Sequence, residues 1–174
     1  MTLPVFKTGG RRVLPVFGAF DSHTLPPIPL FPPMPSDPFK LRRFVEAQEH
    51  VYPRVLAELR RGRKTSHWMW FIFPQIHGLG HSGLAQKYAI SGLEEAKAYL
   101  EHPVLGPRLT ECTELVVAVE RSSIEEIFGY PDDLKFRSSM TLFRHAAGEN
   151  TIFVAALKKY FGGESDPLTL QQLG

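Results

Sequence analysis

Hydrophobic residues recur every three or four positions along most of the chain that follows the first 36 residues. Leu41, Phe44 and Val45 begin one such series, and Phe136 and Met140 belong to another. Residues with this spacing lie on one side of an α-helix. Few stretches alternate with the period of two that a half-buried strand shows, and no Asn-Gly or Asp-Gly turn joins strand-like runs. The pattern therefore predicts an all-α fold.

Prolines and small polar residues divide this pattern into short helices. Residues of these types accept hydrogen bonds at a helix N-cap or suit the first helical turn. The predicted starts are Asp37-Pro38, Pro53, Ser82, Ser91, Pro103, the capping box of Ser123 and Glu126, Pro131, Asn150 and Asp166-Pro167. We expect eight or nine short helices, packed as an irregular array in one compact domain rather than as an up-down bundle.

The first 36 residues show no such periodicity. They contain eight of the 15 prolines, and the run LPPIPLFPPMPSDP crosses their junction with the rest of the chain. Proline fixes φ and removes a hydrogen-bond donor, so this stretch is expected to be extended or disordered. The predicted organisation is a proline-rich disordered tail over residues 1–36 and a single helical domain over residues 37–174.

The segment SHWMWFIFPQ, residues 66–75, is the most apolar part of the predicted domain. Its six consecutive apolar residues are too few for a membrane-spanning helix, which needs about 20. The aromatic content weakly favours a strand. Ser66 as a cap, Pro74 as a stop and the helical neighbours favour a helix over residues 67–73. Because that helix would be apolar on nearly every side, we expect it to form the centre of the core.

Charge and cysteine content narrow the functional classes. The net charge of +2 belongs to the first 36 residues, since the remainder has 17 basic and 17 acidic residues. A neutral body lacks the positive surface that nucleic-acid binding requires. Cys112 is the only cysteine, so no internal disulfide forms and a reducing compartment is expected. These features predict a cytoplasmic protein with neither a nucleic acid nor a membrane as partner.

Polar residues around the aromatic segment form the first candidate site. His67 changes charge near neutral pH, and Trp70 offers a ring on which a planar ligand stacks. Gln75 both donates and accepts hydrogen bonds. Ser82 begins a helix, where anions bind readily, and Lys64 adds positive charge. The alternative is that His67 is an ordinary core histidine and that the glycine-rich loop HGLGHSG is only a turn.

The segment LKFRSSMTLF, residues 134–143, is the second candidate. Ser138 and Ser139 lie in an otherwise apolar helix, three and four residues after Lys135, so the three side chains share one face. Serine with lysine is a known nucleophile and base pair. The alternatives are ligand binding without catalysis, and small side chains that simply permit close helix contact.

Metal, thiol and cofactor chemistry find little support in the sequence. His77 and His81 have the spacing of metal ligands on a helix, but the glycines between them argue against a helix there. Cys112 lies between two nearby glutamates, which disfavour its reactive thiolate. There is no Walker or dinucleotide-binding glycine motif. We therefore expect no metal and no cofactor.

Four segments of the predicted domain carry a family resemblance: DPFKLRRFVEAQ, GRKTSHWMWFIFPQIHGLG, YAISGLEEAKAYLEHPVLGPRL and LKFRSSMTLF. Over residues 37–173, in order and without large gaps, they resemble domain-of-unknown-function family 1810. The resemblance implies a compact, mostly helical single domain, in agreement with the hydrophobic pattern. It implies no defined activity and no catalytic residues.

The leading functional hypothesis is a polar-aromatic pocket for a small anionic or nucleotide-like ligand. His67, Trp70 and Gln75 would form one wall and Lys135 with the serine pair the other. Hydrolysis or group transfer would extend this function, with His67 moving protons and Ser138 as a candidate nucleophile. The alternative is a non-enzymatic protein-interaction module whose proline-rich tail recruits a partner.

Overall fold

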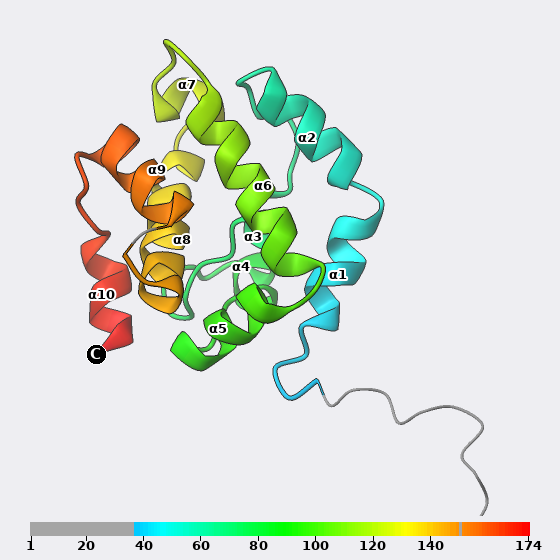
Figure 1. The fold of residues 1–174 in the computed structure, drawn as a ribbon. Coiled ribbons are helices and arrows are strands. Elements are labelled where there is room, and N and C mark those ends of the chain that lie inside the picture. Colours follow the sequence, from blue (N-terminus) through cyan, green and yellow to red (C-terminus); the bar gives the residue numbers. More distant parts are fainter. Residues whose placement is uncertain (1–36, 150) are drawn as a thin grey trace, which may run out of the picture. The chain divides into compact units, whose positions relative to one another are not determined.

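The structure of the protein is a computed structural model, and it describes residues 37–149 and 151–174. These residues all belong to one compact unit (Figure 1). Two predictions, the disordered tail over residues 1–36 and the helix cap at Asn150, lie outside the described residues.

The described part of the chain contains ten helices, and its only strand-like feature is an isolated parallel bridge between Ile76 and Ile90. The all-α prediction is confirmed, with one or two more helices than expected. The helices are α1 (Arg42–Glu49), α2 (Tyr52–Arg60), α3 (Met69–Ile72), α4 (Gly83–Lys87), α5 (Leu93–Glu101), α6 (Leu105–Ala118), α7 (Ile124–Phe128), α8 (Asp132–Ala147), α9 (Ile152–Phe161) and α10 (Pro167–Leu173). No helix among them is long and apolar enough to cross a membrane.

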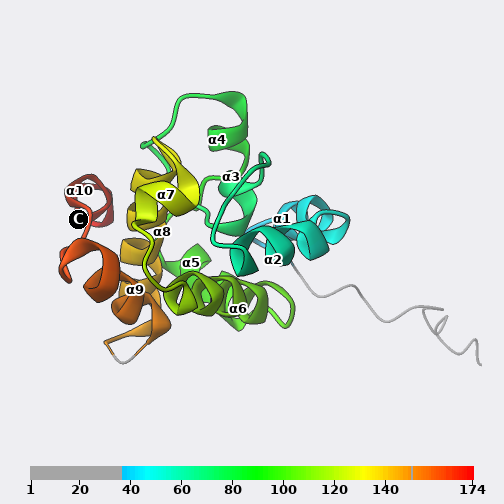
Figure 2. The same cartoon turned by 90° about the horizontal axis from the view of Figure 1, so that it is seen from above.

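The two longest helices organise the array (Figures 1 and 2). Helix α8 packs against α5, α7, α9 and α10, and α6 packs against α2, α5 and α9. The short helix α3 touches α1 and α6 and carries fully buried Met69 and Ile72 into the core. The prediction that the aromatic segment centres the core therefore agrees with its burial.

The predicted helix over residues 67–73 is wrong in extent, because α3 is a single turn that begins at Met69. Ser66 does not cap it. Instead, the backbone N–H of Ser66 donates to Glu58 Oε2 at 3.2 Å and its hydroxyl donates to Glu58 Oε1 at 2.6 Å. Glu58 on α2 thus keeps the loop between α2 and α3 in a non-helical conformation.

Glu58 is the buried anchor of this loop, with a relative exposure of 5%. Besides the two bonds from Ser66, it accepts the backbone N–H of Thr65 at 2.8 Å and the indole N–H of Trp68 at 2.8 Å. Burial alone would raise the pKa of this carboxyl group, but the hydrogen bonds from Ser66, Thr65 and Trp68 outweigh it and lower the pKa to about 2. The charged carboxylate of Glu58 therefore holds the loop that leads into α3 in place.

Several predicted helix starts are confirmed by their capping contacts. Ser82 accepts the backbone N–H of Ala85 at 3.1 Å, and Ser123 with Glu126 forms the complete capping box. Pro53 lies in the first turn of α2, and Pro131 immediately precedes α8.

Three predicted starts need correction. The helix predicted to begin at Pro103 begins at Leu105, the first residue of α6. Asp37 caps as expected, but it accepts the backbone N–H groups of Leu41 and Arg42, so α1 begins at Arg42 rather than at Pro38. Ser91 is not the N-cap of α5, because its N–H and hydroxyl both donate to the buried carboxylate of Glu95. At both Asp37 and Ser91, hydrogen bonds to a carboxylate accompany the difference between the predicted and the observed helix start.

Candidate functional site

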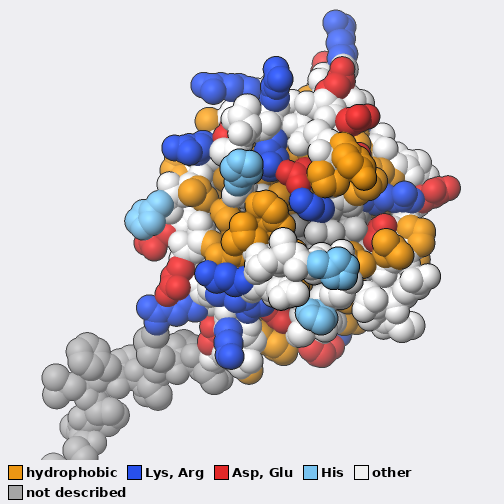
Figure 3. Space-filling model, turned by 180° about the vertical axis from the view of Figure 1, so that it is seen from behind, with side chains coloured by type: hydrophobic (Ala, Val, Ile, Leu, Met, Phe, Trp, Pro, Cys, Tyr) orange, Lys and Arg blue, Asp and Glu red, His pale blue; other side chains and the backbone are white. Residues whose placement is uncertain are grey.

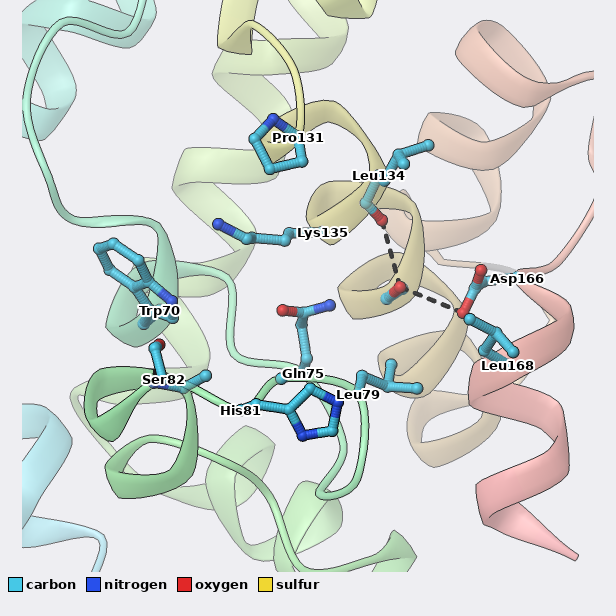
Figure 4. A pocket seen from close by; sticks show the side chains of 13 residues that line it. Trp70, Gln75, Leu79, His81, Ser82, Pro131, Leu134, Lys135, Asp166 and Leu168 are labelled. Atoms are coloured by element: carbon cyan, nitrogen blue, oxygen red, sulfur yellow. Dashed lines mark hydrogen bonds between the residues drawn. The ribbon is translucent and has the colours of Figure 1, made fainter.

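A hollow of about 530 Å³ opens between the loop that follows α3 and the neighbouring surfaces of α4, α8 and α10 (Figure 4). Its lining residues are Trp70, Gln75, Leu79, Gly80, His81, Ser82, Ala85, Pro131, Leu134, Lys135, Ser138, Asp166 and Leu168. In the space-filling view from behind, hydrophobic side chains lie beside histidine, lysine and arginine side chains (Figure 3).

The loop that forms one wall is fixed at its base. The N–H of Ile90 donates to the carbonyl of Gln75 at 2.9 Å, and the N–H of His77 donates to the carbonyl of Ile90 at 2.8 Å. Gly78 has a φ of +96°, and a Cβ there would come within 2.9 Å of Gln172 on α10. The glycine thus lets the loop lie close to α10, so this wall is built into the fold.

A carboxylate between two lysines forms the charged part of the site. Asp132 accepts Lys135 Nζ on Oδ1 at 2.7 Å and Lys64 Nζ on Oδ2 at 2.6 Å. Burial raises the pKa of Asp132, but the hydrogen bonds from Lys135 and Lys64 prevail and lower it. The group carries a net charge of +1, from two lysines and one aspartate. Only Lys135 lines the hollow, and its ammonium lies 4.8 Å from the centre of the Trp70 ring.

A second carboxylate, that of Asp166, joins the two helices of the opposite wall, α8 and α10. Asp166 caps α10 through Oδ2, which accepts the N–H of Thr169 at 2.8 Å and its hydroxyl at 2.7 Å. Ser138 Oγ lies 3.1 Å from the same oxygen and 3.1 Å from the carbonyl of Leu134 (Figure 4). These contacts tie α8 to α10 at the edge of the hollow.

Comparison with known proteins identifies the family. The model of the family described as "Protein of unknown function (DUF1810)" matches residues 38–173. The chain belongs to this family. It is also similar to the conserved hypothetical protein Rv1873 from Mycobacterium tuberculosis, whose crystal structure was determined at 1.38 Å. The identity is 62%, the match covers 79% of this chain and 98% of that chain, and the TM-score is 0.77. No curated protein matches.

In this DUF1810 protein, five of the eight residues predicted for the site come together. Trp70, Gln75, Ser82, Lys135 and Ser138 line one hollow, although more than sixty residues separate the first from the last. Their contribution to binding stays a prediction.

The other three predicted residues do not line the hollow. His67 is exposed and precedes α3. Lys64 is nearly buried, with 8% of its side chain exposed, and contacts Asp132 from outside the hollow. Ser139 is fully buried, and its hydroxyl has no hydrogen-bond partner among the described residues. Neither predicted wall therefore has all of its residues in the lining, and their role in binding stays a prediction.

Among the described residues, Ser138 contacts the carboxylate of Asp166 rather than the lysine that the sequence suggested as its partner. Lys135 Nζ is engaged by Asp132, and within the described part of the chain no hydrogen bond joins it to Ser138. His67 does not reach the hollow lining. A catalytic role for His67 or Ser138 stays a prediction.

Metal and thiol chemistry are equally unsupported in the described residues. They contain no group of three or more metal-ligating side chains. Cys112 is buried, and this burial raises the pKa of its thiol to about 12. The predicted direction agrees, but burial rather than the neighbouring glutamates is the main cause.

Sequence reasoning missed several residues of the hollow. Asp166 was recognised only as a helix cap and His81 only as a weak metal ligand. The apolar lining of Leu79, Leu134 and Leu168 was not predicted. The last two are also exposed, at 49% and 57%, which an ordinary helix pattern does not distinguish from surface leucines.

Proposed function

We propose that the hollow binds a small anionic ligand with a planar ring, such as a nucleotide or an aromatic carboxylate. The observation that carries this proposal is the juxtaposition of Lys135 on α8 and Trp70 on α3, whose ring centre lies 4.8 Å from the Lys135 ammonium, beside an apolar lining. A volume of about 530 Å³ lies within the range of roughly 300–1,000 Å³ that is usual for small-molecule sites.

Lys135 supplies the anion subsite. An ammonium group has three N–H donors, and Asp132 takes one of them. A ligand anion therefore has donors to use without displacing Asp132. Lys64 balances the charge of Asp132 from outside the hollow, so the positive charge of Lys135 is left over for the ligand. The partial burial of this group strengthens its electrostatic attraction for an anion.

The apolar lining supplies the ring subsite. Trp70, Leu79 and Leu134 offer surface against which a planar ring packs, and Gln75 points into the space between the walls (Figure 4). In Figure 4 no hydrogen bond joins the Gln75 amide to another residue drawn, so its donor and acceptor are both open to the ligand. A ring with polar edges, such as a nucleobase, uses both properties.

The test is a calorimetric titration with adenosine 5′-monophosphate and with indole-3-acetate, using adenosine as a neutral control. We expect the wild type to bind both anions and to bind adenosine at least tenfold more weakly than its monophosphate. Lys135→Gln should weaken binding of both anions by tenfold or more, about 1.4 kcal/mol. Lys87→Gln is the matched control, because it removes an exposed lysine that neither lines the hollow nor contacts Asp132.

Equal binding by Lys135→Gln and wild type would remove the anion subsite from the proposal. A complete absence of binding by the wild type would end the proposal for these ligand classes.

A second candidate function, protein interaction, is favoured by one further observation. Among the large hydrophobic side chains that are exposed in the described residues, Leu134 and Leu168 line the hollow, and Leu84 and Tyr130 each adjoin a lining residue in sequence. Exposed apolar groups that gather in one place are typical of binding surfaces. If the wild type binds none of the small probes, this rim supports a protein-binding surface instead.

A further inference from the structure

Asp166 has one oxygen occupied by the protein and one that is not. Its Oδ2 receives three contacts, from Ser138 Oγ and from the N–H and hydroxyl of Thr169. The backbone N–H of Asp166 donates to Thr141 Oγ1 at 2.8 Å, so the main chain is held as well. Its Oδ1 makes no hydrogen bond to the described residues, and it is not among the atoms sealed in the interior without a partner. A fixed carboxylate thus keeps one acceptor oxygen open.

Helix capping does not explain this open oxygen. An N-cap needs one side-chain acceptor, which serine, threonine and asparagine supply as well as aspartate. The negative charge favours the N-terminus of α10, but the second oxygen is not needed for the cap. Asp166 is also one of the residues that line the hollow.

No cation in the described residues neutralises Asp166. Arg137 and Arg144, which contact the neighbouring Ser165, pair with Glu164 and Glu149 instead. Lys135 is held by Asp132 on the other side of the hollow. In Figure 4, Lys135 and Trp70 lie on one side, Asp166 and Leu168 on the other, and Gln75 between them. The site therefore has a cationic end and an end that accepts hydrogen bonds.

We propose that Asp166 Oδ1 accepts a hydrogen bond from a hydroxyl group of the ligand, at the end away from Lys135. This inference rests on the proposed function and narrows its ligand class to hydroxylated anions, such as nucleoside monophosphates with a free ribose diol. Aspartate is well suited to this role, because a carboxylate accepts from sugar hydroxyls with charge-assisted hydrogen bonds. Aromatic carboxylates without hydroxyl groups would use the Lys135 end alone.

The experiment compares adenosine 5′-monophosphate with its 2′,3′-dideoxy counterpart by calorimetry. We expect the wild type to bind the hydroxylated nucleotide at least tenfold more tightly. Asp166→Asn should lose this preference, because the asparagine oxygen continues to cap α10 while an NH₂ donor replaces Oδ1 and cannot accept from a hydroxyl. Binding of the dideoxy nucleotide should stay within about twofold of wild type. Unfolding curves for both proteins establish that the cap survives.

Asp166→Ser is the second variant. It retains an N-cap acceptor but has neither the second oxygen nor a new donor, and it should lose the same preference. Equal binding of the two nucleotides by the wild type would overturn the inference and leave the proposed function standing. A preference that persists in both variants would also overturn it. If the wild type binds neither nucleotide but binds indole-3-acetate, the anion site stands and the hydroxyl site is refuted. If it binds none of the three, both proposals fail.

Discussion

The Glu58 loop and the hollow at Asp166 are two regions in which one carboxylate holds several chain segments together. At Glu58, Ser66, Thr65 and Trp68 supply four hydrogen bonds, and both oxygens are used. At Asp166, all three side-chain contacts fall on one oxygen. The first carboxylate is enclosed by its own chain, whereas the second lines a hollow.

This difference separates a structural role from a binding role. A buried carboxylate with all of its acceptor capacity used by the protein stabilises the fold and has nothing left for a ligand. A carboxylate that is held in place but only half used is preorganised for an outside donor. Substitutions at Glu58 should therefore act on stability, and substitutions at Asp166 on ligand selection.

The largest expected effect is that of Glu58→Gln on stability. Glutamine presents an NH₂ group toward a loop that supplies only donors, and it removes the charge that strengthens these bonds. We expect the free energy of unfolding to fall by about 3 kcal/mol, measured by urea denaturation. Exposed Glu120→Gln is the control and should change it by less than about 0.5 kcal/mol. If Glu58→Gln lowered the free energy of unfolding as little as Glu120→Gln does, the structural role of Glu58, and with it the contrast to Asp166, would be refuted.

The same residue gives stability a defined pH dependence. The pKa of Glu58 is about 2 in the folded protein against 4.5 for a free glutamate, so the unfolded chain takes up a proton first as the pH falls. The contribution of Glu58 is complete above about pH 5 and disappears as the pH falls toward 2, an amount on the order of 3 kcal/mol. The stability difference between wild type and Glu58→Gln should therefore narrow over this range. A difference that stays constant from pH 6 to pH 3 would contradict it.

The sequence predicted what is local and missed what depends on the Glu58 and Asp166 contacts. Pro53, Ser82 and the Ser123 capping box act within one turn of their own helix, so their signals are legible from the chain alone. Ser66 is also a typical N-cap residue, but its hydroxyl donates to the Glu58 carboxylate instead of capping α3. Propensity cannot reveal that competition, because it depends on where α2 places its carboxylate.

The candidate site was predicted in the same uneven way. Residue chemistry pointed to Trp70, Gln75 and Lys135, and the fold brings them together. His67 was predicted because histidine can move protons and this one borders the aromatic segment, but it is exposed and lies outside the lining. Asp166 was missed because its capping role accounts for it fully at the level of sequence. Only the position of its second oxygen shows that capping leaves an acceptor unused.

The smallest expected effect distinguishes the neighbouring residues Ser138 and Ser139. Ser138→Ala removes a contact to Asp166 Oδ2 and should lower the free energy of unfolding by about 1 kcal/mol. The buried hydroxyl of Ser139 has no partner in the described residues, so Ser139→Ala removes an unsatisfied polar atom and adds a better helix former. We expect Ser139→Ala to raise the free energy of unfolding by about 0.5–1 kcal/mol in urea denaturation. Equal losses in the two variants would mean that the Ser139 hydroxyl is satisfied in solution. The contrast between polar groups with and without hydrogen-bond partners in the protein would then apply only to Glu58 and Asp166.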